Sequence, residues 1–378
     1  MLEFLINANS TQESNIFLRK LWCELNEIAP MGWNMYPYRD QNHITIGCSG
    51  FGEISFDYAR KGCIKKLYID NSNHSAAITQ AVQNALHNTL SEYTILLELN
   101  TSDKIHLETS TLGKCQLYSK NGTTYLLIGV KVYSPWDAKM YLPNKFLSIL
   151  SVLYAYTSER FTVERFTIAE HRFNEECTNF CEYTYDWIGL EDRPLSEEKA
   201  IIIPDECLKL LAYIIDDESY CEDIEFLLNS SNMLFTTKSM MDEIEFPHLS
   251  VKADIINSMA CSSLEPLSLI LDKNTAQCET CGNKIFSISQ KIRKMCSRYF
   301  DEDLAKYVSN VIYKNRSIFL HNGLPETTQQ PNRVFFPQIS PATGMIMYPY
   351  GRLQYGVFDL SAYLFRNIAH DLFTGNIE

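Results

Sequence analysis

An arginine and a histidine, Arg316 and His321, are separated by four residues in the run YKNRSIFLHNG. The guanidinium is a permanent cation that can hold a phosphate through parallel hydrogen bonds. The imidazole titrates near neutral pH and can therefore transfer a proton. These two groups are enough for cleavage of RNA without a metal, because the ribose 2′-hydroxyl of the substrate supplies the nucleophile.

The pair stands at the end of a segment with helical apolar spacing, which Asn322-Gly323 closes as a C-terminal cap. Five positions along an α-helix correspond to a rotation of about 140°. Arg316 and His321 therefore do not share one helical stripe. They can meet at one cleft if the helix end loosens, or if a second subunit contributes its own pair. A buried or capping pair without catalysis is the alternative.

The stretch Ile312–Gly323 resembles the ribonuclease motif of HEPN domains, and in particular the C-terminal HEPN domain of ApeA-type abortive-infection proteins. Residues Ser262–Leu267, SSLEPL, are similar to the first-helix LE-x-L of that group. The resemblance covers about residues 246–374, a third of the chain. The residues before this segment carry no such resemblance.

The resemblance implies a short antiparallel helical bundle that forms a homodimer, in which two copies of the motif build one composite RNase site. His321 would be the general base or acid at the 2′-hydroxyl or the 5′-leaving oxygen, and Arg316 would stabilise charge on the phosphorane. No metal or other cofactor is implied, and the products would carry 2′,3′-cyclic phosphates. Supporting or RNA-binding roles would belong to neighbouring polar residues: Lys314, Asn315, Ser317 and Asn322.

The sequence departs from the family pattern at two places. Many relatives have Asn, Asp or His where this chain has Ser317, which weakens the support role of that residue. HEPN antitoxin partners modified by nucleotidyltransferases have a tyrosine two residues after the histidine, and Gly323 stands there instead. That mode of regulation is not implied for this chain.

The composition is that of an ordinary globular protein, with 46% hydrophobic and 21% charged residues among 378. This length favours two or three domains. No apolar run is long enough to span a membrane, and the N-terminus lacks the pattern of a secretory signal. The 12 cysteines are scattered, so we expect reduced thiols and a cytoplasmic location.

The charge is distributed unevenly along the chain. The net charge of −13 by itself disfavours a nucleic-acid partner. Residues 281–378, however, contain 11 Lys and Arg against 7 Asp and Glu, a net charge of +4, whereas the preceding residues contain 22 against 39, or −17. The segment with the Arg/His pair is thus mildly basic, which is compatible with local phosphate contact.

Residue patterns in the first 160 positions predict both helices and strands. Apolar spacing predicts helices at 12–29 and 73–90, the second capped by Asn73. Strand-forming residues predict β-strands, at 43–48, 53–58, 66–70, 93–99, 105–108, 114–118 and 123–133. Asn121-Gly122 predicts a hairpin turn between the last two.

Helices are expected to dominate the rest of the chain. The predicted helices lie at 144–156, 204–215, 221–228, 249–272, 281–299, 301–321 and from Asp359 onward, with Asp301 as a cap and a β-rich or irregular link at 161–170. We therefore expect an α+β fold with three parts: an N-terminal mixed α/β sensor or regulatory domain at 1–160, a mostly helical connecting region at 161–245 and an all-α, HEPN-like helical bundle at 246–378.

Other patterns have simpler structural interpretations. The aromatic and arginine residues of the loop at about 323–355 could bind RNA, but packing of the loop is the simpler explanation. Arg366 and His370 share a helix face at the spacing R-x3-H, and we expect a surface or hydrogen-bonded pair. Cys278 and Cys281 form a lone CxxC without further metal ligands, so reduced thiols are expected. The glycine-rich run Gly47–Gly52 predicts a β-turn.

The expected function is a metal-independent HEPN-type endoribonuclease that acts as an antiphage abortive-infection toxin or effector. RNA is the substrate, and a phage-derived trigger or a regulatory partner would act at the N-terminal region. The alternative is a non-catalytic HEPN scaffold for dimerisation or RNA binding.

Overall fold

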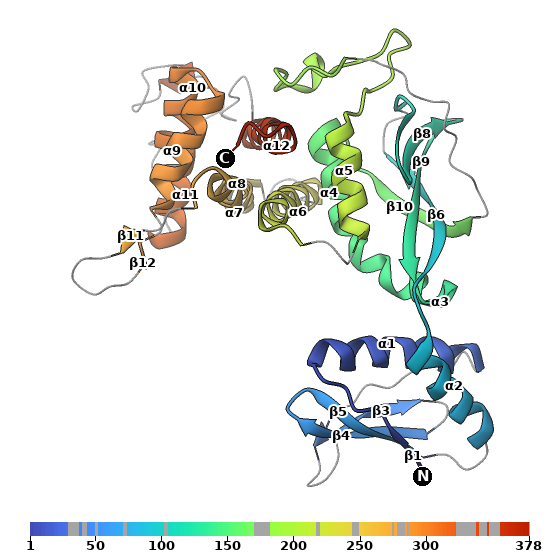
Figure 1. Ribbon diagram of the computed structural model, residues 1–378. Helices are drawn as coiled ribbons and strands as arrows, with labels where there is room; N and C mark the ends of the chain where they lie inside the picture. The colour runs from blue at the N-terminus through green and yellow to red at the C-terminus, as the bar shows by residue number, and fades with distance from the viewer. Residues whose placement is uncertain are drawn as a thin grey trace. The chain divides into compact units, whose positions relative to one another are not determined.

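The fold is mixed α/β, with β-sheets in the N-terminal part and helices toward the C-terminus (Figure 1). The computed structural model describes the following residues: 1–28, 38–39, 44–49, 52–70, 74–101, 105–169, 182–216, 220–243, 249–273, 276–277, 284–285, 287–322, 338–339, 346–347 and 356–377. The chain forms two compact units, residues 1–93 with 129–144 and residues 94–128 with 145–378. The expected boundary at residue 160 falls inside the second unit.

The first unit contains a five-stranded sheet of order β1-β5-β4-β3-β2 in which every neighbouring pair is antiparallel. Its strands are β1 Leu2–Leu5, β2 Tyr38–Arg39, β3 Ile44–Ser49, β4 Gly52–Arg60 and β5 Cys63–Ile69. Its helices are α1 Thr11–Ile28, α2 Ser75–His87 and α3 Pro135–Tyr141. The predicted strands at 43–48, 53–58 and 66–70 and both predicted helices are confirmed. The N-cap of α2 is His74, whereas the predicted cap Asn73 lies outside the described residues.

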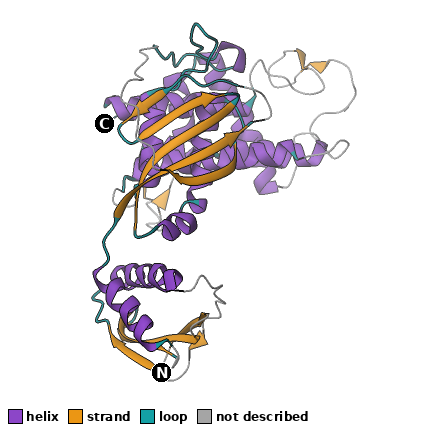
Figure 2. Cartoon of the chain, turned by 90° about the vertical axis from the view of Figure 1, so that its right-hand side faces the viewer, coloured by secondary structure: helices purple, strands orange, loops and turns teal. Residues whose placement is uncertain are grey.

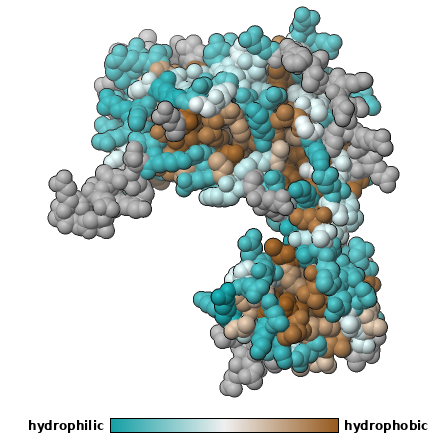
Figure 3. All heavy atoms as spheres, in the orientation of Figure 1, coloured by the Kyte–Doolittle hydropathy of each residue, from teal (hydrophilic) through white to brown (hydrophobic). Residues whose placement is uncertain are grey.

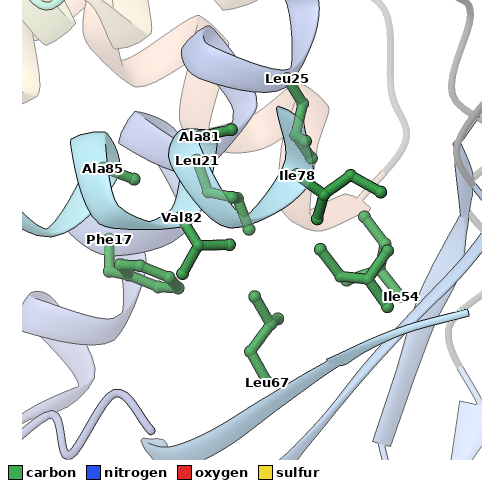
Figure 4. Packing of buried hydrophobic residues seen from close by; sticks show 10 residues of the cluster. Phe17, Leu21, Leu25, Ile54, Leu67, Ile78, Ala81, Val82 and Ala85 are labelled. Atoms are coloured by element: carbon green, nitrogen blue, oxygen red, sulfur yellow. The ribbon is translucent and has the colours of Figure 1, made fainter. Parts of the chain in front are cut away.

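The core of the first unit lies between the sheet and the helices α1 and α2. Figure 4 shows Phe17, Leu21 and Leu25 of α1 and Val82 of α2 beside Ile54 and Leu67 of the sheet, and all these side chains are buried. Their spacing in α1 is three to four residues, so they form one helical face. Ile16 and Ile28 of the same helix are exposed.

The glycine-rich run joins β3 to β4, and Gly50 and Phe51 lie outside the described residues. Gly52 has φ = 109°, and a Cβ at this position would lie 1.9 Å from the carbonyl oxygen of Asp70. Both the backbone angle and the close approach therefore require glycine. The flanking residues Ser49 and Gly52 pair across β3 and β4, and the predicted β-turn itself lies outside the described residues.

The second unit is built on a sheet of order β10-β6-β9-β8-β7, and Figure 2 shows this sheet in front of a layer of helices. Its strands are β6 Ser91–Asn100, β7 Ser110–Leu112, β8 Cys115–Lys120, β9 Thr123–Val132 and β10 Thr162–Ala169. Asn121 and Gly122 have φ of 53° and 79° in the two-residue turn between β8 and β9, which confirms the predicted hairpin. The expected link at 161–170 is the edge strand β10, paired with β6.

The predicted strand at 105–108 is wrong. Leu107 makes only an isolated bridge to Ile201, with hydrogen bonds from Glu108 N to Ile201 O and from Ile201 N to His106 O. Leu107 is buried, but its burial comes with the contact to Ile201 and not with pairing in a sheet.

Two helices pack on the inner side of this sheet, α4 Pro143–Thr157 and α5 Asp205–Ile215, both as predicted (Figures 1 and 2). The next helix, α6 Glu222–Asp242, is 21 residues long, whereas the sequence predicted only 221–228. Buried serines explain the difference, since they interrupt the apolar pattern without ending the helix. Ser230 Oγ donates to Ser263 O at 2.7 Å, and Ser231 Oγ is 3.0 Å from Ser151 Oγ.

The remaining helices follow α6 toward the C-terminus (Figure 1). They are α7 Leu249–Ser262, α8 Leu264–Leu271, α9 Ile288–Tyr299, α10 Glu302–Tyr307, α11 Tyr313–Asn322 and α12 Val357–Thr374, with a π-helical segment, η2 Val308–Ile312, between α10 and α11. Two short ladders pair β11 Ala276–Gln277 with β12 Lys284–Ile285 and β13 Gln338–Ile339 with β14 Ile346–Met347. The predicted helix at 281–299 thus begins only at Ile288.

The surface of these helices is divided by polarity. Figure 3 shows hydrophilic residues over α9 and α10 and apolar residues over the neighbouring helix ends. Leu264, Leu267 and Ile292 are buried as expected from their spacing, whereas Ile255 is 40% exposed and does not point inward. Across the described ranges, no helix combines the length and hydrophobicity that crossing a lipid bilayer requires.

Candidate active site

The R-x4-H motif lies on the second half of a continuous helical run from Glu302 to Asn322. Asp301 caps its start, with Oδ1 accepting a hydrogen bond from Leu304 N at 2.8 Å, as predicted. The sequence predicted one uninterrupted α-helix, but Val308–Ile312 form a π-helical segment, in which Tyr313 N donates to Val308 O. Such segments widen the helix by one residue per turn and often occur at functional sites.

Arg316 is fixed by two acceptors from other helices. Its Nε donates to Ser262 Oγ at 3.0 Å, and its Nη2 lies 2.6 Å from Glu265 Oε1. The guanidinium carbon also lies 5.3 Å from the centroid of the Tyr313 ring. The side chain is 16% exposed, so these contacts hold it in place while solvent still reaches part of it.

These contacts leave part of the guanidinium available. Arginine carries five N–H donors, and the described contacts of Arg316 engage one on Nε and one on Nη2. Among the described residues, the donors on Nη1 and the second donor on Nη2 have no hydrogen-bond acceptor.

The acceptors Ser262 and Glu265 come from a break between α7 and α8, where the sequence predicted one helix at 249–272. Pro266 has no backbone N–H and cannot donate to Ser262 O, so the helix is interrupted at Ser263. Because proline is tolerated in a first turn, α8 restarts at once. The break sets the Ser262 hydroxyl and the Glu265 carboxylate against α11.

Tyr313 completes this cluster, because its hydroxyl donates to Glu265 Oε1 at 2.9 Å. Burial of the ring and the neighbouring Glu265 carboxylate raise the pKa of Tyr313 above its ordinary value. The phenol therefore stays protonated and remains a donor at neutral pH. Tyr313 and Arg316 together hold the carboxylate from two positions on α11.

His321 lies in the last turn of α11, and its side chain is exposed. It shares a helix face with Lys314 and Ser317, since these residues are spaced by three and four positions. Arg316 points to the other side, toward α7 and α8. The described contacts of Arg316 do not include His321.

A cavity of about 360 Å³ lies on the His321 side of the helical run. Its described lining residues come from the start of α9, from η2 and from α11: Ser289, Ser309, Asn310, Tyr313, Lys314 and Ser317. Lys314 and Ser317 therefore lie together in the lining of the cavity. Of the other two predicted supporting residues, Asn315 is partly buried and Asn322 is exposed.

The structure adds residues that the sequence did not assign to the site. Glu265 was noted only within the LE-x-L stretch, and Ser262 and Tyr313 only as parts of the resembling segments. The helix-breaking Pro266 after two serines is the signal that could have placed Ser262 and Glu265 at a bend. Nothing in the sequence indicates the π-helical segment that brings Ser309 and Asn310 to the cavity.

The second Arg/His pair, Arg366 and His370 on α12, is hydrogen-bonded, as predicted, although the buried Nε of Arg366 has no partner among the described residues. Arg366 is fully buried, donates to Ala155 O at 2.8 Å and to Trp187 O at 2.7 Å, and stacks on the Trp187 ring. Burial lowers its pKa to about 10. His370 Nδ1 is 3.1 Å from Glu206 Oε1.

The remaining candidate patterns cannot be placed. Cys278, Cys281 and most of the loop at 323–355 lie outside the described residues. Among the residues that are described, no three His, Cys, Asp or Glu side chains gather as a metal site would require.

Comparison with known proteins adds no relative. The chain matches no protein-family model, no curated protein and no solved structure.

Proposed function

We propose that this protein is a metal-independent endoribonuclease of HEPN type. The observation that carries the proposal is the contact between Arg316 and Glu265. It joins the two stretches that resemble HEPN sequences, which lie some fifty residues apart in the chain. An arginine held in one orientation, with donors left over, suits an anionic transition state.

The proposed chemistry divides between two side chains. Arg316 places its free N–H donors against a non-bridging oxygen of the scissile phosphate and stabilises the charge that builds there. His321, exposed at the end of α11, takes the proton from the 2′-hydroxyl, and His321 of the second copy gives one to the 5′-leaving oxygen. The 2′-oxygen forms the new P–O bond while the 5′-oxygen leaves, which gives a 2′,3′-cyclic phosphate.

The orientation of the two side chains supports a homodimer. Because Arg316 is held against α7 and α8, and five positions place His321 about 140° away around α11, we take one chain by itself as an incomplete site. A second copy related by a two-fold axis can supply the missing group. Light scattering of the purified protein tests this step: a monomer at the concentrations where RNA is cleaved would contradict the composite site.

The biological role we propose is an antiphage abortive-infection effector. An RNase without strong sequence choice arrests its own host, so its activity must be held back until infection. The acidic N-terminal part, including the first unit, is the part we assign to sensing a phage-derived trigger or a regulatory partner. This assignment predicts that expression of the C-terminal residues without that part is more toxic than expression of the whole chain.

The direct test uses labelled single-stranded RNA with EDTA present. We expect cleavage by the wild-type protein to survive chelation, to leave 2′,3′-cyclic phosphate ends and to be lost in His321→Ala and Arg316→Ala. Because a latent enzyme needs its trigger, growth arrest on overexpression is measured in parallel. Absence of both cleavage and arrest in the wild-type protein would overturn the proposal.

A second function is favoured by the same contact. An ion pair that holds Arg316 against α8 also fits a helical scaffold for dimerisation or RNA binding, in which the arginine is structural. RNA binding or dimerisation that is unchanged in His321→Ala, without cleavage by the wild-type protein, would identify the scaffold.

A further inference from the structure

The cavity beside α11 lies on the helix face that ends at His321. Lys314 and Ser317 line it, and His321 follows Ser317 by one helical turn, an axial rise of about 6 Å. A strand of RNA with its scissile phosphate at His321 would therefore pass the mouth of the cavity with an adjoining nucleotide.

The lining is suited to a nucleotide. Lys314 provides the cation, and three serines and an asparagine provide hydroxyl and amide groups. Ser309 Oγ donates to Ala305 O at 2.7 Å, which leaves the lone pairs of its oxygen as acceptors. The volume of about 360 Å³ lies within the range of sites for small organic ligands.

The surrounding charge favours an anion. Helix α9, which packs beside η2, contains four basic residues and no acidic one, Lys291, Arg293, Lys294 and Arg298. Lys294 is paired with Asp272, Arg298 is paired with Asp371, and Lys291 is buried against Asp272 O, so Arg293 is the cation of α9 without a described acidic partner. Helix α11 adds Lys314, and its Arg316 is paired with Glu265. The acidic residues of the adjacent α10 are Glu302 and Asp303, and Glu302 is paired with Lys306.

We propose that this cavity is an RNA subsite that holds the nucleotide adjoining the cleaved bond. Lys314 binds its phosphate, and the hydroxyls of Ser289, Ser309 and Ser317 bind its ribose 2′-hydroxyl. The inference rests on the proposed RNase function, because it takes the direction of the RNA from His321. It adds that the protein distinguishes RNA from DNA at a nucleotide that is not cleaved.

The experiment measures binding in the His321→Ala protein, so that it does not depend on cleavage. The probes are a single-stranded oligoribonucleotide and its 2′-deoxy counterpart. Lys314→Gln is compared with Lys306→Gln, which removes the same charge from the same helical run but outside the cavity lining. A third variant, Ser289→Ala with Ser317→Ala, keeps all charges.

Lys314→Gln should weaken binding of both probes about ten-fold. It should also reduce the slope of log K against log salt by about 0.7, the value for one phosphate contact with a single strand. Lys306→Gln should change neither quantity. The serine variant should weaken RNA about five-fold and leave DNA unchanged.

Equal effects of Lys314→Gln and Lys306→Gln, or equal loss of RNA and DNA in the serine variant, would overturn the subsite. If cleavage by the wild-type protein still depends on Arg316 and His321, the RNase proposal survives that result. Conversely, selective loss of RNA binding in a protein that never cleaves RNA would keep the subsite and reject the RNase. Failure of the His321→Ala protein to bind either probe would reject the subsite.

Discussion

Glu265 binds two residues of α11 with one carboxylate oxygen: Oε1 lies 2.6 Å from Arg316 Nη2 and 2.9 Å from the Tyr313 hydroxyl. Both partners lie in the first turn of α11, so the contact fixes that turn against the bend between α7 and α8. A charge-assisted hydrogen bond in a partly buried place is stronger than an exposed ion pair. The orientation of Arg316 thus depends on a residue from another helix.

Glu265→Gln should therefore lower the cleavage rate about ten-fold with little change in RNA affinity, because Arg316 loses its orientation and keeps its charge. Ser262→Ala removes only the neutral contact to Nε and should cost less, about two- to five-fold. Single-turnover cleavage measures both. Glu225→Gln is a matched control, since Glu225 accepts from the Tyr213 hydroxyl at 3.0 Å without an arginine. A faster Glu265→Gln enzyme would show that the ion pair restrains Arg316 instead of positioning it.

Arg316→Lys should behave almost like Arg316→Ala in cleavage. The guanidinium reaches Ser262 and Glu265 with separate nitrogens and carries further donors on Nη1. A lysine ammonium can follow one of these directions but cannot reproduce the planar fork. Cleavage at saturating RNA is the measurement, with circular dichroism to show that the fold is retained. Activity within about three-fold of wild type would mean that only the charge at position 316 matters.

The two Arg/His pairs of this chain allow an internal comparison. Arg366 is buried, and its loss leaves Ala155 O and Trp187 O without their donor, so Arg366→Met should reduce the free energy of unfolding by about 2–4 kcal/mol. His370→Ala should leave cleavage unchanged, whereas His321→Ala should abolish it. Urea unfolding measures the stability of Arg366→Met, and RNA cleavage measures the activity of the two histidine variants. Loss of cleavage in a folded His370→Ala protein would indicate that the active site lies at α12 and not at α11.

Local signals in the sequence predicted much of the fold because they act over a few residues. Asn121-Gly122 alone defines a hairpin turn, and Asp301 alone defines a helix start, so both could be located without the structure. Contacts over long distances could not be predicted. Ser230 interrupts the apolar pattern, and the contact with Ser263 O that accounts for its burial is not visible in the sequence, so the predicted helix was too short.

The candidate site likewise has features that local sequence signals predict and features that depend on contacts between distant residues. The identities of Arg316 and His321 follow from their chemistry, but the direction of each side chain depends on what lies opposite. The sequence gives no indication that Glu265 reaches Arg316, because that contact joins α8 to α11. The π-helical segment could not be predicted either, because no residue type in Val308–Ile312 is specific for this conformation.

Cys115 gives a prediction about pH and stability. Its thiol lies in the core of the second unit, and burial raises its pKa from 9.0 to about 12. Since the folded pKa is the higher one, the contribution to stability is complete below pH 9 and is lost as pH rises toward 12. At pH 10.5 the loss relative to pH 8 is about 2 kcal/mol, because the unfolded thiol has ionised and the buried one has not.

Cys115→Ala removes this effect but leaves every other titrating group in place. The difference in unfolding free energy between wild type and Cys115→Ala should therefore shrink by about 2 kcal/mol between pH 8 and pH 10.5, measured by urea unfolding with a reductant. Cys221→Ala, whose thiol lies partly exposed at the start of α6, controls for removal of a sulfur outside the core. A difference that stays constant across this pH range would mean that water reaches the Cys115 thiol in the folded protein. The face of β8 on which Cys115 lies would then be less tightly packed than the burial of this residue indicates.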